Sequence, residues 1–109
     1  VGDATAALEA SGGYLADALG KLYVPCTASS ASPVRTIAAR RLSGFGDMYS
    51  VAGSLSMLGR NITQEEVGGL GLTLVADELG SGITGETIYV DAGYHAMGMF
   101  LPEEQNKSA

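Results

Sequence analysis

The chain has 109 residues, a formal net charge of −6 and one cysteine, Cys26. This length allows one domain at most, the acidic balance disfavours nucleic-acid binding, and a lone cysteine forms no internal disulfide. The sequence contains no apolar run of about 18 residues that would predict a transmembrane helix, and its start lacks a secretory signal pattern. Composition therefore predicts a cytoplasmic protein with neither nucleic-acid nor membrane partners.

The first part of the chain predicts a helix followed by a short strand. Gly12-Gly13 interrupts the helical pattern, and Gly20 is suited to end it. Residues 22–28 predict the strand, although Pro25 lacks the N–H that a central strand needs. The helical spacing, with one buried face, is carried by small and apolar residues at positions 4, 7, 8, 11, 15, 18 and 19.

Three helices are predicted next. Residues 33–42 and 46–57 indicate two short helices, with Ser32 before Pro33 as the candidate cap of the first. Thr63 and Glu66 have the spacing of a capping box, in which hydroxyl and carboxylate satisfy each other's backbone N–H groups. We expect this third helix to end near residue 79. Its apolar stripe is formed by Val67, Leu70, Leu74 and Val75.

The last predicted element is a strand at residues 87–90, rich in β-branched and aromatic side chains, with Asp91 holding the turn that follows. The order helix-strand-helix-helix-helix-strand predicts an α/β fold with a parallel strand pair. Two strands make a poor parallel sheet, so we expect further strands beside them. We divide the chain into a domain at residues 1–101 and a polar tail at residues 102–109.

Three blocks of sequence carry a resemblance to a known family. They are residues 6–16, the segment Ser30–Thr36 and residues 59–94. Together they resemble the C-terminal part of the NADH-dependent enoyl-acyl-carrier-protein reductases, Rossmann-type members of the short-chain dehydrogenase superfamily that act in fatty acid biosynthesis. The match extends without gaps up to Met99 and covers less than half of the family's length. It implies the C-terminal portion of a Rossmann-type parallel sheet.

The resemblance also implies a cofactor, NAD, and a substrate, the enoyl thioester of the acyl carrier protein. Val34 would contact the nicotinamide carboxamide through its backbone, and Thr36 would donate its hydroxyl to a phosphate. For Thr36, an ordinary role in the first turn of a helix is the alternative. The acyl pocket would be lined by apolar residues for which simple helix packing is the alternative: Ala38, Ala39, Leu42 and Phe45.

The departures from the family pattern concern catalysis. Thr5 stands at the position of the catalytic lysine and carries no positive charge, and the catalytic tyrosine would lie just before Val1. Ser32 replaces a glycine that lets the backbone approach the cofactor. The sequence also lacks a G-x-G-x-x-G phosphate loop after a strand. We therefore assign no catalytic residue and expect no turnover by the chain alone.

Other candidate residues have weaker support. Tyr14 and Lys21 have the Y-x6-K spacing of such reductases, but Gly20 is expected to end the helix between them, and a partly buried Tyr14 is the preferred interpretation. His95 is expected to be structural, and no metal site is predicted. Two further hypotheses remain: a non-catalytic, self-associating remnant that forms a homo-oligomer, or a missing N-terminal half supplied by another chain.

Overall fold

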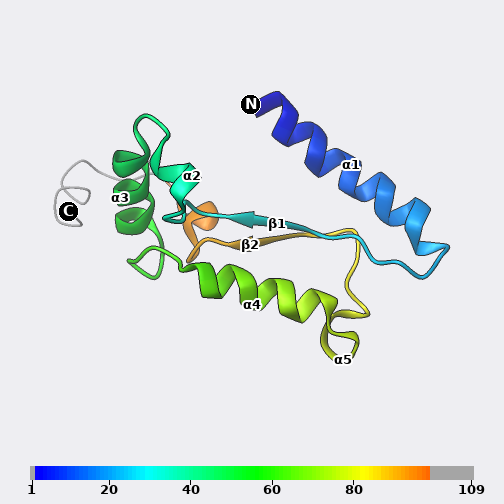
Figure 1. The fold of residues 1–109 in the computed structure, drawn as a ribbon. Helices are drawn as coiled ribbons and strands as arrows, with labels where there is room; N and C mark the ends of the chain where they lie inside the picture. Colours follow the sequence, from blue (N-terminus) through cyan, green and yellow to red (C-terminus); the bar gives the residue numbers. More distant parts are fainter. Residues whose placement is uncertain (1, 99–109) are drawn as a thin grey trace. The chain divides into compact units, whose positions relative to one another are not determined.

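The computed structural model describes residues 2–98 (Figure 1). Its elements confirm the predicted α/β class. They are α1 (Gly2–Gly20), β1 (Ala28–Ala31), α2 (Ile37–Arg40), α3 (Phe45–Leu55), α4 (Gln64–Val75), α5 (Asp77–Gly80), β2 (Thr87–Val90) and the 3-10 turn η1 (Tyr94–Ala96). The predicted tail at residues 102–109 lies outside the described residues. Within residues 2–98, no helix is both long and apolar enough to span a membrane.

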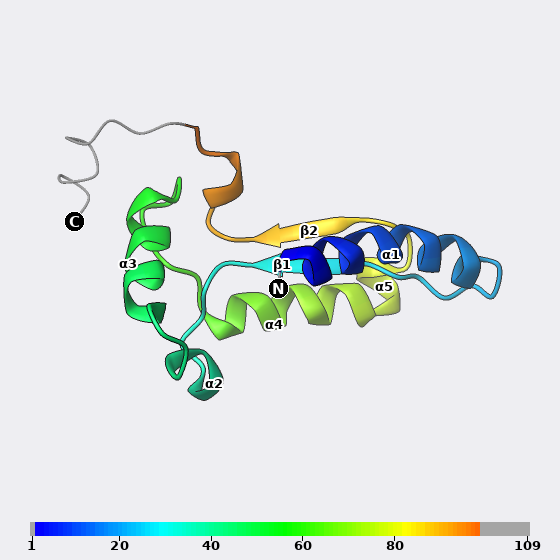
Figure 2. The ribbon, with the colours of Figure 1, turned by 90° about the horizontal axis from the view of Figure 1, so that it is seen from above.

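The two strands pair in parallel, as both views show (Figures 1 and 2). The Ala28 N–H donates to the Glu86 carbonyl at 2.9 Å, and the Ser32 N–H donates to the Val90 carbonyl at 3.1 Å. Donor and acceptor advance together by four residues, which is the pattern of a parallel pair. The prediction of a parallel strand pair is confirmed.

The strand predicted at residues 22–28 is wrong in position, because β1 begins only at Ala28. The end of α1 takes up the preceding residues: the N–H groups of Leu22 and Val24 both donate to the Leu19 carbonyl, at 2.9 and 3.1 Å. Tyr23 between them has a φ of 61°, which no strand residue adopts. The glycine pair at residues 12 and 13 was expected to interrupt α1, but the helix continues through it.

The helix boundaries between residues 33 and 80 also differ from the prediction. α2 starts after Thr36, not at Pro33, because Thr36 is extended (φ −103°, ψ 162°) and its side chain accepts the Ala39 N–H. The helix expected to end near residue 79 is divided at Ala76 (φ −79°, ψ 120°), which separates α4 from α5. Residues 33–80 therefore contain one more short helix than the sequence predicted.

The described residues form two compact units. Unit 1 contains residues 2–30 and 69–88. Its buried residues include Ala16 of α1, and Cys26 is joined to the segment before β2 by its N–H bond to Thr84 Oγ1 (2.9 Å) and by the Gly85 N–H, which donates to its carbonyl (2.8 Å).

Unit 2 contains residues 31–68 and 89–98. Its apolar core consists of Phe45, Ala52 and Ile62, and two polar residues, Ser56 and Asp91, are buried beside them. All of the predicted cofactor and acyl-pocket residues belong to this unit. The candidate site therefore lies within unit 2.

Candidate functional site

The loop that precedes α2 carries the two predicted cofactor residues. The Thr36 N–H donates to the Val34 carbonyl at 2.8 Å, which closes a three-residue turn. The Thr36 hydroxyl accepts the Ala39 N–H at 3.0 Å, so its own proton stays available to a ligand. Among the described residues, no hydrogen bond engages the Val34 N–H. The loop therefore presents one hydroxyl and one amide donor.

Two contacts from distant residues hold this loop. The side-chain amide of Gln64, the first residue of α4, donates to the Arg35 carbonyl at 3.1 Å. The Arg35 guanidinium lies 4.5 Å from the centre of the Tyr49 ring, within the range of a cation–π interaction. Neither contact could be predicted from the sequence, because both partners lie on other elements and leave no local periodic signal.

The predicted acyl-pocket residues have different environments. Leu42 is 62% exposed, whereas Phe45 is only 7% exposed and its ring centroid lies 5.7 Å from that of Tyr49. Ala38 and Ala39 both lie on α2, the first exposed and the second half-buried. The Phe45 N–H donates to the Leu42 carbonyl at 3.3 Å, so these two residues are adjacent. Their assignment to an acyl pocket stays a prediction.

Unit 2 contains a cavity of about 660 Å³ beside these residues. Of the predicted site residues, only Phe45 lines it. Its wall combines three arginines with aromatic, hydroxyl and amide groups: Arg35, Arg40, Phe45, Gly46, Tyr49, Ser50, Gly53, Ser54, Gly59, Arg60 and Asn61.

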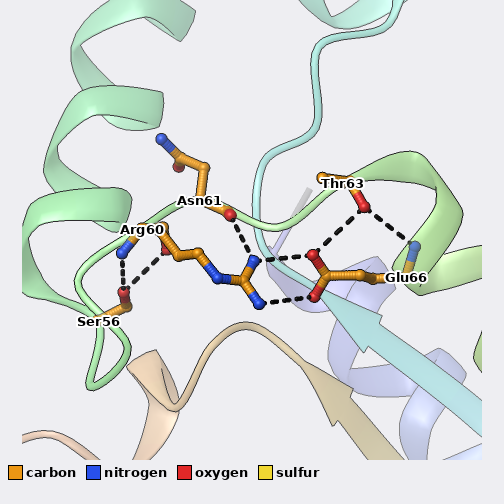
Figure 3. A network of polar contacts seen from close by, with 5 residues as sticks. All are labelled: Ser56, Arg60, Asn61, Thr63 and Glu66. Carbon is orange, nitrogen blue, oxygen red and sulfur yellow. Dashed lines mark hydrogen bonds and ion pairs between the residues drawn. The ribbon is translucent and has the colours of Figure 1, made fainter.

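A network of polar contacts joins the end of α3 to the start of α4 (Figure 3). The Arg60 guanidinium donates to both carboxylate oxygens of Glu66, at 2.7 and 3.3 Å, and to the Asn61 carbonyl at 3.0 Å. The buried Ser56 hydroxyl accepts the Arg60 N–H at 3.2 Å. The hydrogen bond from Arg60 lowers the pKa of Glu66, and the same bond raises the pKa of Arg60.

The predicted capping box is confirmed in one half. The Thr63 hydroxyl accepts the Glu66 N–H at 3.2 Å, as expected. The Glu66 carboxylate binds Arg60 and accepts the Thr63 hydroxyl at 3.3 Å, instead of returning to the Thr63 N–H. A nearby guanidinium is a stronger partner for a carboxylate than a neutral amide, which explains the difference.

A second polar cluster follows β2. The buried Asp91 carboxylate accepts the Gly93 N–H (3.0 Å) and the His95 N–H (2.9 Å), and it lies 2.9 Å from His95 Nδ1. The His95 ring stacks on Tyr89 with centroids 3.8 Å apart. Burial is the largest influence on the Asp91 pKa and opposes ionisation, but the hydrogen bonds from His95 and Gly93 together lower the pKa. Asp91 thus holds the predicted turn, and His95 has structural contacts.

Two residues of α1 were considered as positions related to catalysis. Thr5, which the resemblance places at the catalytic lysine position, lies on the exposed surface of the helix. Tyr14 was expected to be partly buried, and this is wrong, because its side chain is 81% exposed. α1 ends at Gly20, before Lys21, as predicted. Over residues 2–98, no group of three or more potential metal-ligating side chains is found.

Comparison with known proteins gives consistent matches. Residues 1–95 match the family model described as enoyl-(acyl carrier protein) reductase. The enoyl-acyl-carrier-protein reductase (NADH) of Rickettsia typhi is 46% identical over 98 residues, which are 90% of this chain and 37% of that protein. The corresponding NADPH enzyme of Staphylococcus aureus is 43% identical over 97 residues. The chain thus spans less than two fifths of the length of these relatives.

Solved structures show the same likeness. The enoyl-acyl-carrier-protein reductase (NADH) of Aquifex aeolicus superposes with a TM-score of 0.84 at 40% identity, over 91% of this chain and 38% of that one. The reductase of Anaplasma phagocytophilum, solved in complex with NAD, has a TM-score of 0.79 at 50% identity and covers 86% of this chain and 36% of that one. These neighbours have the Rossmann-type fold that the sequence predicted.

Proposed function

Because the chain belongs to the enoyl-(acyl carrier protein) reductase family, we propose that it forms the C-terminal part of an NADH-dependent reductase of fatty acid biosynthesis. The bound nicotinamide would supply a hydride to the double bond of an enoyl thioester. This chain would contribute the loop at Val34 and Thr36 to the cofactor site. It would contribute Ala38, Ala39, Leu42 and Phe45 to the acyl site.

The observation that supports this proposal is the arrangement of donors in the loop before α2. The Thr36 hydroxyl is oriented by the Ala39 N–H, which it accepts at 3.0 Å, and its proton remains able to donate to a phosphate oxygen. The neighbouring Val34 N–H is free for a carbonyl acceptor such as a carboxamide, while its own carbonyl is held by the Thr36 N–H. Both donors fit a cofactor that carries a phosphate and a carboxamide.

We further propose that the isolated 109-residue chain does not turn over. A catalytic lysine fixes the cofactor and stabilises developing negative charge, and Thr5 can do neither. A crotonyl thioester assay with the purified chain should show no NADH oxidation. Measurable oxidation that follows the amount of chain would contradict this part of the proposal.

NADH titration tests the loop directly. Thr36→Asp keeps a side chain that caps α2 but places a negative charge where a phosphate would bind. Thr36→Ser keeps both the cap and the donated proton. If the loop holds the cofactor phosphate, Thr36→Asp should weaken NADH binding by at least about tenfold, the loss of one charge-assisted hydrogen bond, and Thr36→Ser should bind as the unaltered chain does. Equal NADH affinity of the Asp variant would refute the assignment.

An alternative function is a self-associating structural module, favoured by exposed apolar side chains in unit 1. The side chains that are more than half exposed on α1, α4 and α5 include Leu8, Tyr14, Leu72, Val75 and Leu79. Association that covers these side chains would remove apolar area from water. The partner would be a second copy or a missing N-terminal half. Light scattering distinguishes these, because a homo-oligomer forms from the pure chain, whereas a missing half leaves it monomeric until that half is added.

A further inference from the structure

The cavity in unit 2 gathers positive charge that the proposed contacts of Val34 and Thr36 do not use, although one of its arginines, Arg35, lies in the same loop. Neither Val34 nor Thr36 lines it, but Arg35, Arg40 and Arg60 do. These are three of the four arginines in a chain whose net charge is −6. None of the described residues that line it is an aspartate or a glutamate. The cavity is therefore a local basic site on an acidic protein.

Among residues 2–98, two of the three guanidinium groups have no carboxylate partner. Arg60 is neutralised by its paired contacts to Glu66, and the other ion pair among residues 2–98 joins His95 to Asp91. Arg35 and Arg40 therefore bring two uncompensated positive charges to the cavity. Arg35 is also oriented, because its guanidinium stacks 4.5 Å from the centre of the Tyr49 ring.

An amide group adds a neutral donor to the same wall. Figure 3 shows the Asn61 side chain turned away from the Arg60–Glu66 pair, while its backbone carbonyl accepts from Arg60. Its side-chain nitrogen lies against Gly53, where an added Cβ would be 2.5 Å away. The Oδ1 atom is buried without a hydrogen-bond partner. Since the wall also contains hydroxyl groups, at Ser50 and Ser54, the cavity presents several donors around two cations.

We propose that this cavity binds the phosphate group of a small ligand, held by Arg35 and Arg40 with a further hydrogen bond from the Asn61 amide. Two guanidinium groups match the charge of a phosphate dianion, and their fork of donors suits its oxygens. A volume of about 660 Å³ lies within the usual range for small-molecule sites. The glycine at residue 53 leaves space for the Asn61 amide at the cavity wall.

Inorganic phosphate is the simplest probe. We would titrate it into the isotope-labelled 109-residue chain at constant ionic strength and follow the backbone amide resonances. Saturable shifts are expected at Arg35, Arg40 and Asn61. Arg40→Gln should weaken phosphate binding by at least about tenfold. Arg41→Gln removes the same charge from the next residue, which does not line the cavity, and should leave the affinity unchanged.

Four outcomes would overturn the proposal. Shifts that do not saturate show that no site exists, and equal losses for Arg40→Gln and Arg41→Gln show a general charge effect. Tighter binding of acetate than of phosphate shows a carboxylate site instead. NADH titration of Arg40→Gln separates this site from the proposed cofactor loop, since loss of phosphate binding with unchanged NADH affinity supports two independent sites. Loss of both places the phosphate in the cofactor site and overturns the proposal.

Discussion

Replacing Asp91 with asparagine tests whether one carboxylate holds the turn after β2. Asp91 Oδ1 accepts the Gly93 N–H, and Oδ2 accepts both the backbone N–H and the ring nitrogen of His95. Asparagine has nearly the same shape and keeps one oxygen for Gly93. Its amide nitrogen cannot accept from the backbone N–H of His95, so that charge-assisted hydrogen bond is lost, whereas the amide can donate to the His95 ring nitrogen in the other tautomer. We expect the free energy of unfolding to fall by about 1.5–3 kcal/mol.

The effect should depend on pH in a defined direction. The folded-state pKa of Asp91 is lowered, so its ionised form contributes stability that is fully present above the unfolded-state pKa of about 3.9 and is lost as the pH falls through the lower folded-state value. The difference between the unaltered chain and Asp91→Asn should therefore be constant near neutral pH. It should shrink below about pH 4.

Urea unfolding followed by far-UV circular dichroism measures this difference. With a slope of about 1.5 kcal/mol per molar urea, the midpoint should fall by about 1–2 M. Asp17→Asn is the matched control, because Asp17 is exposed on α1 and the substitution removes the same charge. An equal loss in the control, or a difference that persists unchanged far below pH 4, would refute the argument.

Four further substitutions and one control test local features of the fold. Gly93 and Gly44 both have positive φ, so each change to alanine should lower the free energy of unfolding by about 1–2 kcal/mol. The Gly93 variant should lose more stability in urea unfolding, because its new Cβ would lie 2.7 Å from Met57 Cβ. Equal losses for the two variants would contradict this. Thr63→Ala removes the cap of α4 and should cost about 1 kcal/mol, measured by thermal unfolding. Ser56→Ala leaves the Arg60 N–H without the hydroxyl that accepts it and should lower the free energy of unfolding by about 1–2 kcal/mol. The control Ser50→Ala, at an exposed position, should leave the melting temperature unchanged.

The two strands show what could be predicted from the sequence. β2 was predicted at its observed bounds, because its β-branched and aromatic residues are bounded by turn-forming ones. β1 was misplaced, because it consists of alanine and serine, residues without strand preference, while the apolar run before it resembles a strand. The strand state of Ala28–Ala31 comes from pairing with β2, which no local pattern reports.

The candidate site was also predicted only in part. The sequence left open a first-turn helix role for Thr36 and indicated Ser32 as the candidate cap, but the structure shows Thr36 itself as the cap of α2. The family resemblance supplied the cofactor and acyl-pocket assignments, which stay predictions. The cavity was not predicted, because its arginines are spread over 25 positions of the chain, from Arg35 to Arg60. Only tertiary folding brings them to one wall.

The bond from Gln64 to the Arg35 carbonyl couples the first turn of α4 to the loop before α2. A ligand that binds the loop only in this bonded conformation must also stabilise the helix start, since binding to one state of a coupled pair lowers the population of the other. Amide hydrogen exchange in the first turn of α4 would then slow when the loop is occupied. Hydrogen exchange of the α4 amides would then measure occupancy of the loop, and Gln64→Ala should abolish this slowing.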